Sequence, residues 1–151
     1  MTSPCPICAL HQDQVSRERY EIQRSGLWVL RHHPTPAPLP GWMLLDTLRH
    51  CAGPVDCTTD EAIVRGIAVQ QASQLVQQLT QCDRVYAIAF GEGAQHLHLH
   101  LIPRLIAEYS TKAWAVADHY RAVELNDHPP ADPAQVEALI LKARQKKFVL
   151  G

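Results

Sequence analysis

The segment His96-Leu97-His98-Leu99-His100-Leu101-Ile102-Pro103-Arg104 places a histidine at every second position of an otherwise apolar run. Because successive side chains of a β-strand point to opposite faces, the three histidines would form one row and the leucines the other. The leucines can then pack into a core while the imidazoles line a surface or cleft. The segment therefore predicts a strand whose neighbouring histidines lie about 7 Å apart, at roughly 3.4 Å per residue.

Three imidazoles in one row favour chemistry over a merely polar strand face, because imidazole titrates near neutrality and is both a nucleophile and a metal ligand. The spacing leaves two hypotheses open. In the first, the central His98 attacks phosphorus while a neighbouring group donates to the phosphate oxygens. In the second, two of the histidines hold a catalytic metal with an open coordination position. The second hypothesis also needs a carboxylate base, for which Asp46 and Glu92 are the candidates.

The flanking segments predict antiparallel hairpins and one long helix. Residues 85–90 form an apolar run and Gly91-Glu92-Gly93-Ala94 a tight turn, so the histidine row is the return strand of a hairpin. Thr58-Thr59-Asp60-Glu61 starts a helix to about residue 81, because capping side chains precede apolar residues at three- and four-residue steps. The other predicted elements are strands at residues 27–30, 42–45 and 114–116 and helices at residues 11–22 and 132–147.

Length and composition limit the class of protein. A chain of 151 residues that is 46% hydrophobic predicts a single globular domain over residues 1–151. No apolar run approaches the roughly 18 residues of a membrane span, and a net charge of -1 argues against a general nucleic-acid binder. Five cysteines exclude a complete disulfide framework, and the first residues lack a signal-peptide pattern. We therefore expect reduced thiols and a cytoplasmic location.

The pair Cys5-Pro6-Ile7-Cys8 has three interpretations. A redox pair would need a strand–helix–strand context that the sequence does not show. Two inert thiols are the second interpretation, and half of a closed structural zinc site with two further nitrogen or sulfur ligands is the third. The remaining cysteines, Cys51, Cys57 and Cys82, are expected to be packing residues.

The row resembles the motif of the histidine triad family, His-φ-His-φ-His-φ-φ, in which φ is apolar. Pro40-Gly41-Trp42-Met43-Leu44-Leu45 with Arg49-His50, and the cysteine pair, resemble further segments of its bacterial members. The resemblance covers residues 5–104 and leaves 105–151 as a C-terminal extension with a helix. It implies an α+β fold with an antiparallel sheet of about five strands, one long packed helix and a homodimer.

The resemblance also implies an enzyme that hydrolyses or transfers a nucleotidyl group at the α-phosphate of nucleotide conjugates such as dinucleoside polyphosphates. His98 would be the nucleophile that forms a nucleotidyl-histidine, and His100 would contact the phosphate oxygens and the leaving group. The chemical step would need no metal. The alternatives are a hydrolase whose metal is held by the histidine row itself and a zinc-stabilised nucleotide-binding module without turnover.

By the same resemblance His50 would be the third zinc ligand beside Cys5 and Cys8, and His96, the first histidine of the row, is the best candidate for the fourth. Zinc on His96 would leave His98 available for attack. Three features depart from the family pattern. The segment before the row, residues 90–95, is short and lacks an Asn. Trp42 stands where a histidine is common, and alternate prolines over residues 34–40 replace the segment that helps to hold the ribose. The other prominent residues are assigned structural positions: Trp28, Trp42 and Trp114 in the core or a pocket wall, and His32-His33 and His119-Tyr120 at the surface.

Overall fold

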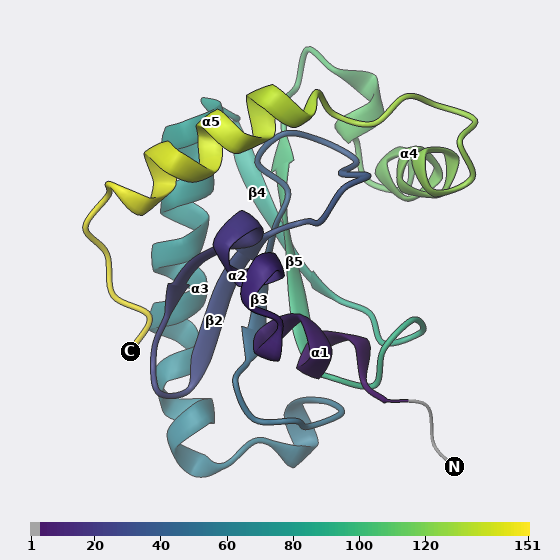
Figure 1. Ribbon diagram of the computed structural model, residues 1–151. Coiled ribbons are helices and arrows are strands. Elements are labelled where there is room, and N and C mark those ends of the chain that lie inside the picture. Colours follow the sequence, from purple (N-terminus) through teal and green to yellow (C-terminus); the bar gives the residue numbers. More distant parts are fainter. Residues whose placement is uncertain (1–3) are drawn as a thin grey trace.

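A five-stranded antiparallel sheet forms the centre of the protein, whose residues 4–151 are described by a computed structural model (Figure 1). The strands are β1 Glu21–Arg24, β2 Trp28–His32, β3 Met43–Thr47, β4 Arg84–Ala89 and β5 His98–Arg104, and they lie side by side in the order β1-β2-β3-β5-β4. This arrangement confirms the α+β fold with five antiparallel strands that the sequence predicts.

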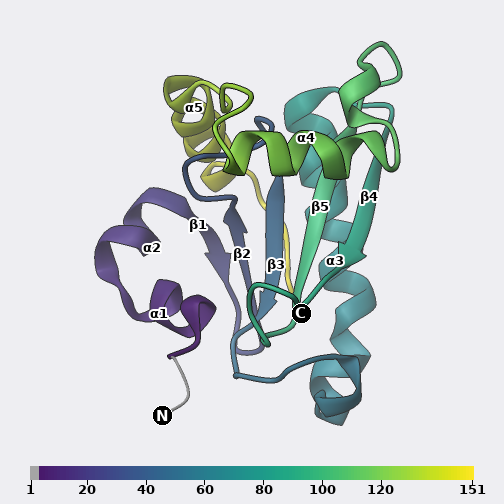
Figure 2. The same ribbon diagram turned by 90° about the vertical axis from the view of Figure 1, so that its right-hand side faces the viewer.

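Helices cover the two faces of the sheet unequally. The helices are α1 Pro6–Gln12, α2 Gln14–Tyr20, α3 Thr59–Thr80, α4 Ala115–Glu124 and α5 Pro133–Arg144, with 3-10 turns at Pro54–Asp56 and Tyr109–Thr111. The long helix α3 packs along one face, and Figure 2 shows the opposite face, where α4 crosses near one end and α1 and α2 lie beside β1. None of the helices described over residues 4–151 is both long and apolar enough to cross a bilayer.

The long helix α3 forms as predicted because its N-terminus has a capping box, in which Thr58 and Glu61 cap each other's backbone N–H groups. Thr58 accepts from the backbone N–H of Glu61, and the Glu61 carboxylate accepts from the backbone N–H of Thr58. Arg49 donates to the same carboxylate over 3.0 and 2.9 Å, which ties the start of α3 to the loop after β3. The buried side of the helix is lined largely by small and branched residues, Ala68, Ala72, Leu75 and Val76.

The alternation of β5 separates core from site. Leu97 and Leu101 lie in the main core with the buried side of α3, and Leu99 packs against them. The strand itself begins at His98, two residues later than expected, but pairing with neighbouring segments continues upstream, because Leu97 donates to the Cys51 carbonyl over 2.7 Å. The histidines therefore lie on the face of the sheet opposite α3.

Two local predictions near the chain's ends were wrong. Residues 114–116 do not form a strand: Trp114 precedes helix α4, has a φ of 71° and is 88% exposed, so it is not a core residue. Val116 and Val123, seven residues apart, form the buried side of α4. The helix predicted over residues 11–22 is two short helices, because Asp13 ends α1 and its carboxylate caps α2.

A buried histidine holds the proline-rich connection between β2 and β3 in place. His32 is fully buried, not at the surface as expected, and its Nε2 accepts from the Gly41 backbone N–H over 2.9 Å. Burial lowers the pKa of His32 to about 4, so the ring is neutral at pH 7. Gly41 has a φ of 86°, and a Cβ there would lie 2.2 Å from Thr80 Cγ2. The start of β3 therefore approaches α3 closely.

We expect Gly41→Ala to lower the free energy of unfolding by about 2–4 kcal/mol, because the added methyl group meets Thr80 and the left-handed backbone becomes strained. Gly66→Ala is the matched control: Gly66 lies in α3, and a methyl group there would have no other atom within 4 Å, so the exchange should be neutral or stabilising by up to about 1 kcal/mol. Urea unfolding measures both. Equal stability of Gly41→Ala and the native protein would contradict the close approach.

Neutral His32 should make stability depend on pH. Its folded pKa of about 4 lies below the unfolded value of roughly 6.5, so its stabilisation is full above pH 6.5 and is lost as the pH falls towards 4. Between pH 7 and pH 5 this loss is about 2 kcal/mol. The difference in unfolding free energy between the native protein and His32→Asn should shrink by that amount, and a difference that is constant with pH would refute the assignment.

Candidate functional site

The face of the sheet opposite α3 collects the polar residues of three neighbouring strands. In the antiparallel register, Asp46 of β3 lies opposite His98 of β5, and Leu44 lies opposite both His100 and Arg31 of β2. Directly opposed residues share a face of the sheet. His98, His100, Asp46 and Arg31 are therefore brought to one surface by backbone pairing alone.

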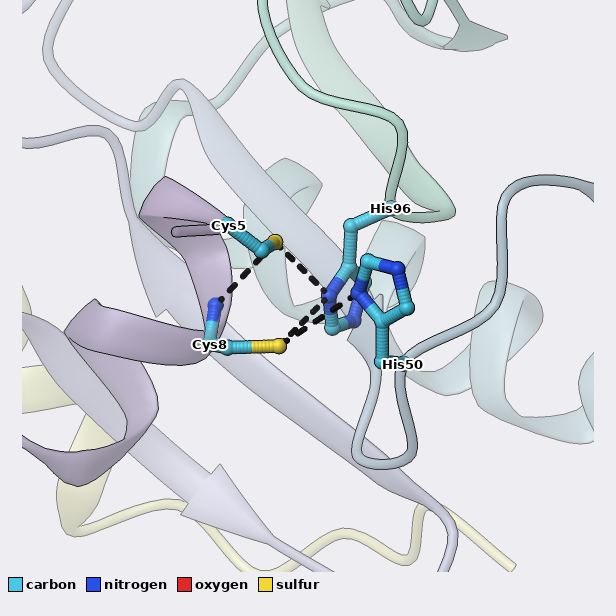
Figure 3. A group of neighbouring side chains, drawn as sticks. All are labelled: Cys5, Cys8, His50 and His96. Atoms are coloured by element: carbon cyan, nitrogen blue, oxygen red, sulfur yellow. Dashed lines mark hydrogen bonds between the residues drawn. The ribbon is translucent and has the colours of Figure 1, made fainter. Parts of the chain in front are cut away.

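All four predicted zinc ligands meet at one end of this surface (Figure 3). Cys5 caps α1 and Cys8 lies in its first turn, so the helix brings the two sulfur atoms to one side. His50 comes from the loop after β3, and His96 from the residues before β5. One ligand atom of each residue lies within 4.8 Å of all the others, and three sulfur-to-Nδ1 distances are 3.5 Å.

The geometry and the donor set fit zinc. Tetrahedral coordination with Zn–S of about 2.3 Å and Zn–N of about 2.1 Å would separate sulfur and nitrogen by about 3.6 Å. The Nε2 of His96 lies 2.7 Å from the Thr47 carbonyl oxygen, which can only accept, so the ring hydrogen is on Nε2 and the lone pair of Nδ1 faces the sulfurs. A carbonyl partner of this kind is typical of metal-bound histidines. Burial lowers the pKa of His96, which keeps the ring neutral.

A second group of possible ligands, Cys51, Cys57 and Glu61, is already occupied by structural contacts. The Glu61 carboxylate accepts from Arg49 and from the Thr58 backbone. Burial raises the pKa of the Cys57 thiol, and Cys51 and Cys82 are both buried in the main core. The assignment of Cys51 and Cys82 as packing residues is confirmed.

The ring of His98 presents a lone pair from Nε2. Its Nδ1 lies 2.6 Å from the backbone oxygen of His96, and because a carbonyl oxygen only accepts, Nδ1 carries the hydrogen. The neutral ring then has its lone pair on Nε2. The side chain of His98 is only partly buried, so a ligand can reach it.

His100 is enclosed by aromatic rings. The indole Nε1 of Trp42 donates to its Nδ1 over 2.9 Å, and the ring of Tyr120 lies edge-on at 6.0 Å between centroids. Burial, with smaller contributions from the charges of His98 and His33, lowers the pKa of His100 to about 3. At neutral pH His100 is therefore uncharged.

The extension after residue 104 contributes to the aromatic surroundings of His100. Tyr120 of α4 contacts His33, whose Nε2 lies 3.0 Å from the phenol oxygen, and His119 lies 2.8 Å from the Pro38 carbonyl oxygen. The prediction that His33, His119 and Tyr120 are isolated surface groups was wrong. No local signal indicates these contacts, because their partners lie more than 80 residues apart in the chain.

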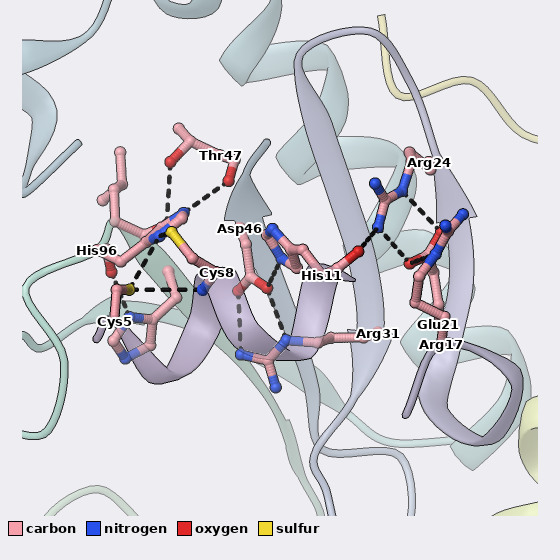
Figure 4. Close-up of polar contacts among 12 residues, drawn as sticks. Cys5, Cys8, His11, Arg17, Glu21, Arg24, Arg31, Asp46, Thr47 and His96 are labelled. Carbon is pink, nitrogen blue, oxygen red and sulfur yellow. Dashed lines mark hydrogen bonds and ion pairs between the residues drawn. The ribbon is translucent and has the colours of Figure 1, made fainter. Parts of the chain in front are cut away.

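Asp46 is part of a buried ionic network (Figure 4). Arg31 donates to its carboxylate over 2.6 and 3.2 Å, and His11 Nε2 lies 2.8 Å from Oδ2. Burial alone would raise the pKa of Asp46, but the charge of Arg31 and the contact with His11 together hold it at about 2. Both carboxylate oxygens are engaged, and Glu92 lies exposed in the turn before β5, so neither carboxylate is placed as a base beside the row. Neither Arg31 nor His11 belongs to a motif that predicts this network from the sequence.

No protein-family model and no curated protein sequence matches the chain. Solved structures do match. A hypothetical histidine triad nucleotide-binding protein from Sulfolobus tokodaii is 16% identical with a TM-score of 0.66, over 93% of this chain and 90% of that one. A Zn-bound histidine triad family protein from Mycobacterium smegmatis is 15% identical with a TM-score of 0.65, over 93% of each chain.

A histidine triad protein from Bradyrhizobium japonicum is 21% identical with a TM-score of 0.64, over 89% of this chain and 95% of that one. At these identities the likeness concerns the fold. Because two of these structures each cover 93% of this chain, the likeness continues beyond residue 104. At least part of the region that contains α4 and α5 therefore has a counterpart in them. The sheet order, the long helix and the histidine row on the open face all agree with one conclusion: this chain has the fold of the histidine triad proteins.

Proposed function

We propose that the protein is a histidine triad enzyme that hydrolyses or transfers a nucleotidyl group at the α-phosphate of nucleotide conjugates such as dinucleoside polyphosphates. The observation that carries the proposal is the hydrogen bond from His98 Nδ1 to the His96 carbonyl, which directs a lone pair from Nε2 on the open face of the sheet. The similar structure from Sulfolobus tokodaii is described as a nucleotide-binding protein, which supports the substrate class.

In the proposed reaction Nε2 of His98 attacks the α-phosphorus. A P–N bond forms as the bond from phosphorus to the leaving-group oxygen breaks, and His100 contacts the phosphate oxygens as charge moves. Water or another acceptor then attacks phosphorus, and His98 is released with its lone pair restored. Two displacements replace one difficult displacement, which is the advantage of covalent catalysis.

Zinc, when bound, would have a structural role in this scheme. Cys5, Cys8, His50 and His96 would hold it, and no step of the reaction passes through it. The site would join α1 to the residues before β5 and so steady the main-chain carbonyl that orients His98. A closed site of four protein ligands is typical of structural zinc.

Three further properties belong to the same proposal. We retain a single domain over residues 1–151, because α4 packs its Tyr120 against the site. We retain the cytoplasm as the location, because all five cysteines are free thiols. We retain the homodimer that the resemblance implies, which sedimentation analysis would test.

His98→Asn should lose more than about 90% of turnover and still bind nucleotide, because Asn can hydrogen-bond but cannot form the phosphorus–nitrogen adduct. A tenfold loss corresponds to about 1.4 kcal/mol of transition-state stabilisation. His128→Asn, at an exposed histidine away from the row, is the matched control and should keep full activity. The measurement is turnover of a panel of nucleotide conjugates, with a denaturing quench at alkaline pH to trap the adduct, because the phosphorus–nitrogen bond is labile in acid. Retention of more than a tenth of the activity would exclude His98 as the nucleophile, and binding without turnover or adduct in the native protein would favour a non-catalytic module.

Freshly purified protein should contain one zinc per chain, and chelation should lower the melting temperature by more than about 10 °C, because structural zinc binding contributes directly to folding. Cys5→Ser should behave like the chelated protein, whereas Cys57→Ser, at a cysteine outside the four-ligand cluster, should keep its zinc. Elemental analysis and calorimetry measure these effects. A closed site holds one ion. Less than about 0.2 zinc per chain, together with a melting temperature that chelation does not change, would therefore mean that Cys5 and Cys8 are two ordinary thiols. Complete and immediate loss of activity in folded, chelated protein would instead favour a catalytic metal.

A further inference from the structure

The indole of Trp42 contacts the histidine row. The alternation of histidine and leucine in the sequence does not predict this contact. Trp42 is 2% exposed, and its Nε1 lies 2.9 Å from His100 Nδ1 with the two rings nearly perpendicular at 89°. An indole N–H can only donate. The Nδ1 of His100 must therefore be the acceptor, and the neutral ring carries its hydrogen on Nε2.

The partners of His98 and His100 thus impose different proton positions on these two rings. His98 Nδ1 faces a carbonyl oxygen and carries a hydrogen, whereas His100 Nδ1 faces an indole N–H and carries none. The two rings lie next to each other, with centroids 5.2 Å apart. Side by side, the neutral rings expose opposite functions from Nε2: an electron pair on His98 and an N–H on His100.

We propose that Trp42 is a positioning residue that selects the Nε2–H tautomer of His100, so that a neutral imidazole donates a hydrogen bond to the phosphate oxygens beside His98. The tautomer follows from the contact itself, and only its catalytic consequence rests on the proposed function. Protonation of Nδ1 would set two N–H groups against each other and break the bond to Trp42. A charged His100 is therefore disfavoured by the same contact that selects the tautomer.

The surroundings of His100 agree with an uncharged donor. Burial is the main cause that lowers its pKa, and the ionisable groups that act on it are His98 on the same strand, His33 and Arg31 of the β2 side and Asp46 of β3. Three of these four groups are or can become cations, and they disfavour a second positive charge. The uncharged ring of Tyr120, from α4, also lies against His100.

The position of Trp42 is itself well defined. Its side chain packs in a buried cluster with Leu39, Ile102 and Val116, and its ring lies 5.3 Å from that of Tyr120. Burial of an indole does not require such a bond: Trp28 is fully buried, and its Nε1 has no hydrogen-bond partner within residues 4–151. The contact of Trp42 with His100 is therefore a specific feature, and Trp28 provides a matched control.

Trp42→Phe tests the proposal, because it keeps an aromatic ring and removes only the donor. In ¹⁵N-labelled protein, long-range ¹H–¹⁵N spectra distinguish the two imidazole tautomers, and His100→Gln identifies the His100 signals by their loss. We expect native His100 to be a single Nε2–H tautomer at pH 7. Trp42→Phe should show mixed tautomers at pH 7, whereas Trp28→Phe should retain the native pattern.

The kinetic result should follow the spectrum. Trp42→Phe should lower kcat at least about tenfold, less than the roughly 10²–10³-fold lost when such a donor is removed outright, with little change in KM, and Trp28→Phe should change neither. A native His100 protonated on Nδ1, or a Trp42→Phe spectrum identical to the native one, would overturn the proposal. The native spectrum decides this even if Trp42→Phe does not fold. If His98→Asn stays active while the tautomer is as expected, the reaction scheme fails and the role of Trp42 in proton position stands.

Discussion

The antiparallel pairing of β3 with β5 is the constraint on which the rest of the structure depends. It sets Asp46 opposite His98 and Leu44 opposite His100, and it directs Leu99 and Leu101 towards the core. A slip of one residue would exchange the faces and bury the histidines beneath α3. The apolar contacts under α3 therefore hold the register, and the register in turn places every polar group of the site.

On the face of the sheet opposite α3, the side chains are oriented by hydrogen-bond partners that can act only as acceptors or only as donors. Carbonyl oxygens of Thr47 and His96 each fix one ring hydrogen, and the guanidinium of Arg31 keeps Asp46 ionised. Such contacts, made inside a protein of low effective dielectric constant, orient the groups before any ligand arrives. The Cys–His cluster extends this order to α1, because His96 contributes a side chain to the cluster and a carbonyl to His98.

Periodicity and motif predicted much of this arrangement. The row before and within β5, the capped helix α3 and the meeting of Cys5 and Cys8 with two distant histidines all follow from local spacing or from the family resemblance. The network of Asp46 and the aromatic wall around His100 could not be predicted in this way, since single contacts between distant segments leave no repeating pattern in the sequence. The three residues 114–116 were too short a window to distinguish a strand from the first turn of α4.

The contacts of α4 have a consequence for how the protein is made. His119 and Tyr120 reach back 81 and 87 residues to Pro38 and His33, so these contacts cannot form until the chain has emerged from the ribosome as far as α4. A nascent chain that ends after β5 contains the complete histidine motif but lacks the α4 side chain that lies against His100. Contacts of such long sequence separation are also the slowest to form. The face that carries the histidine row should consequently be completed late in synthesis, only after α4 has folded against it.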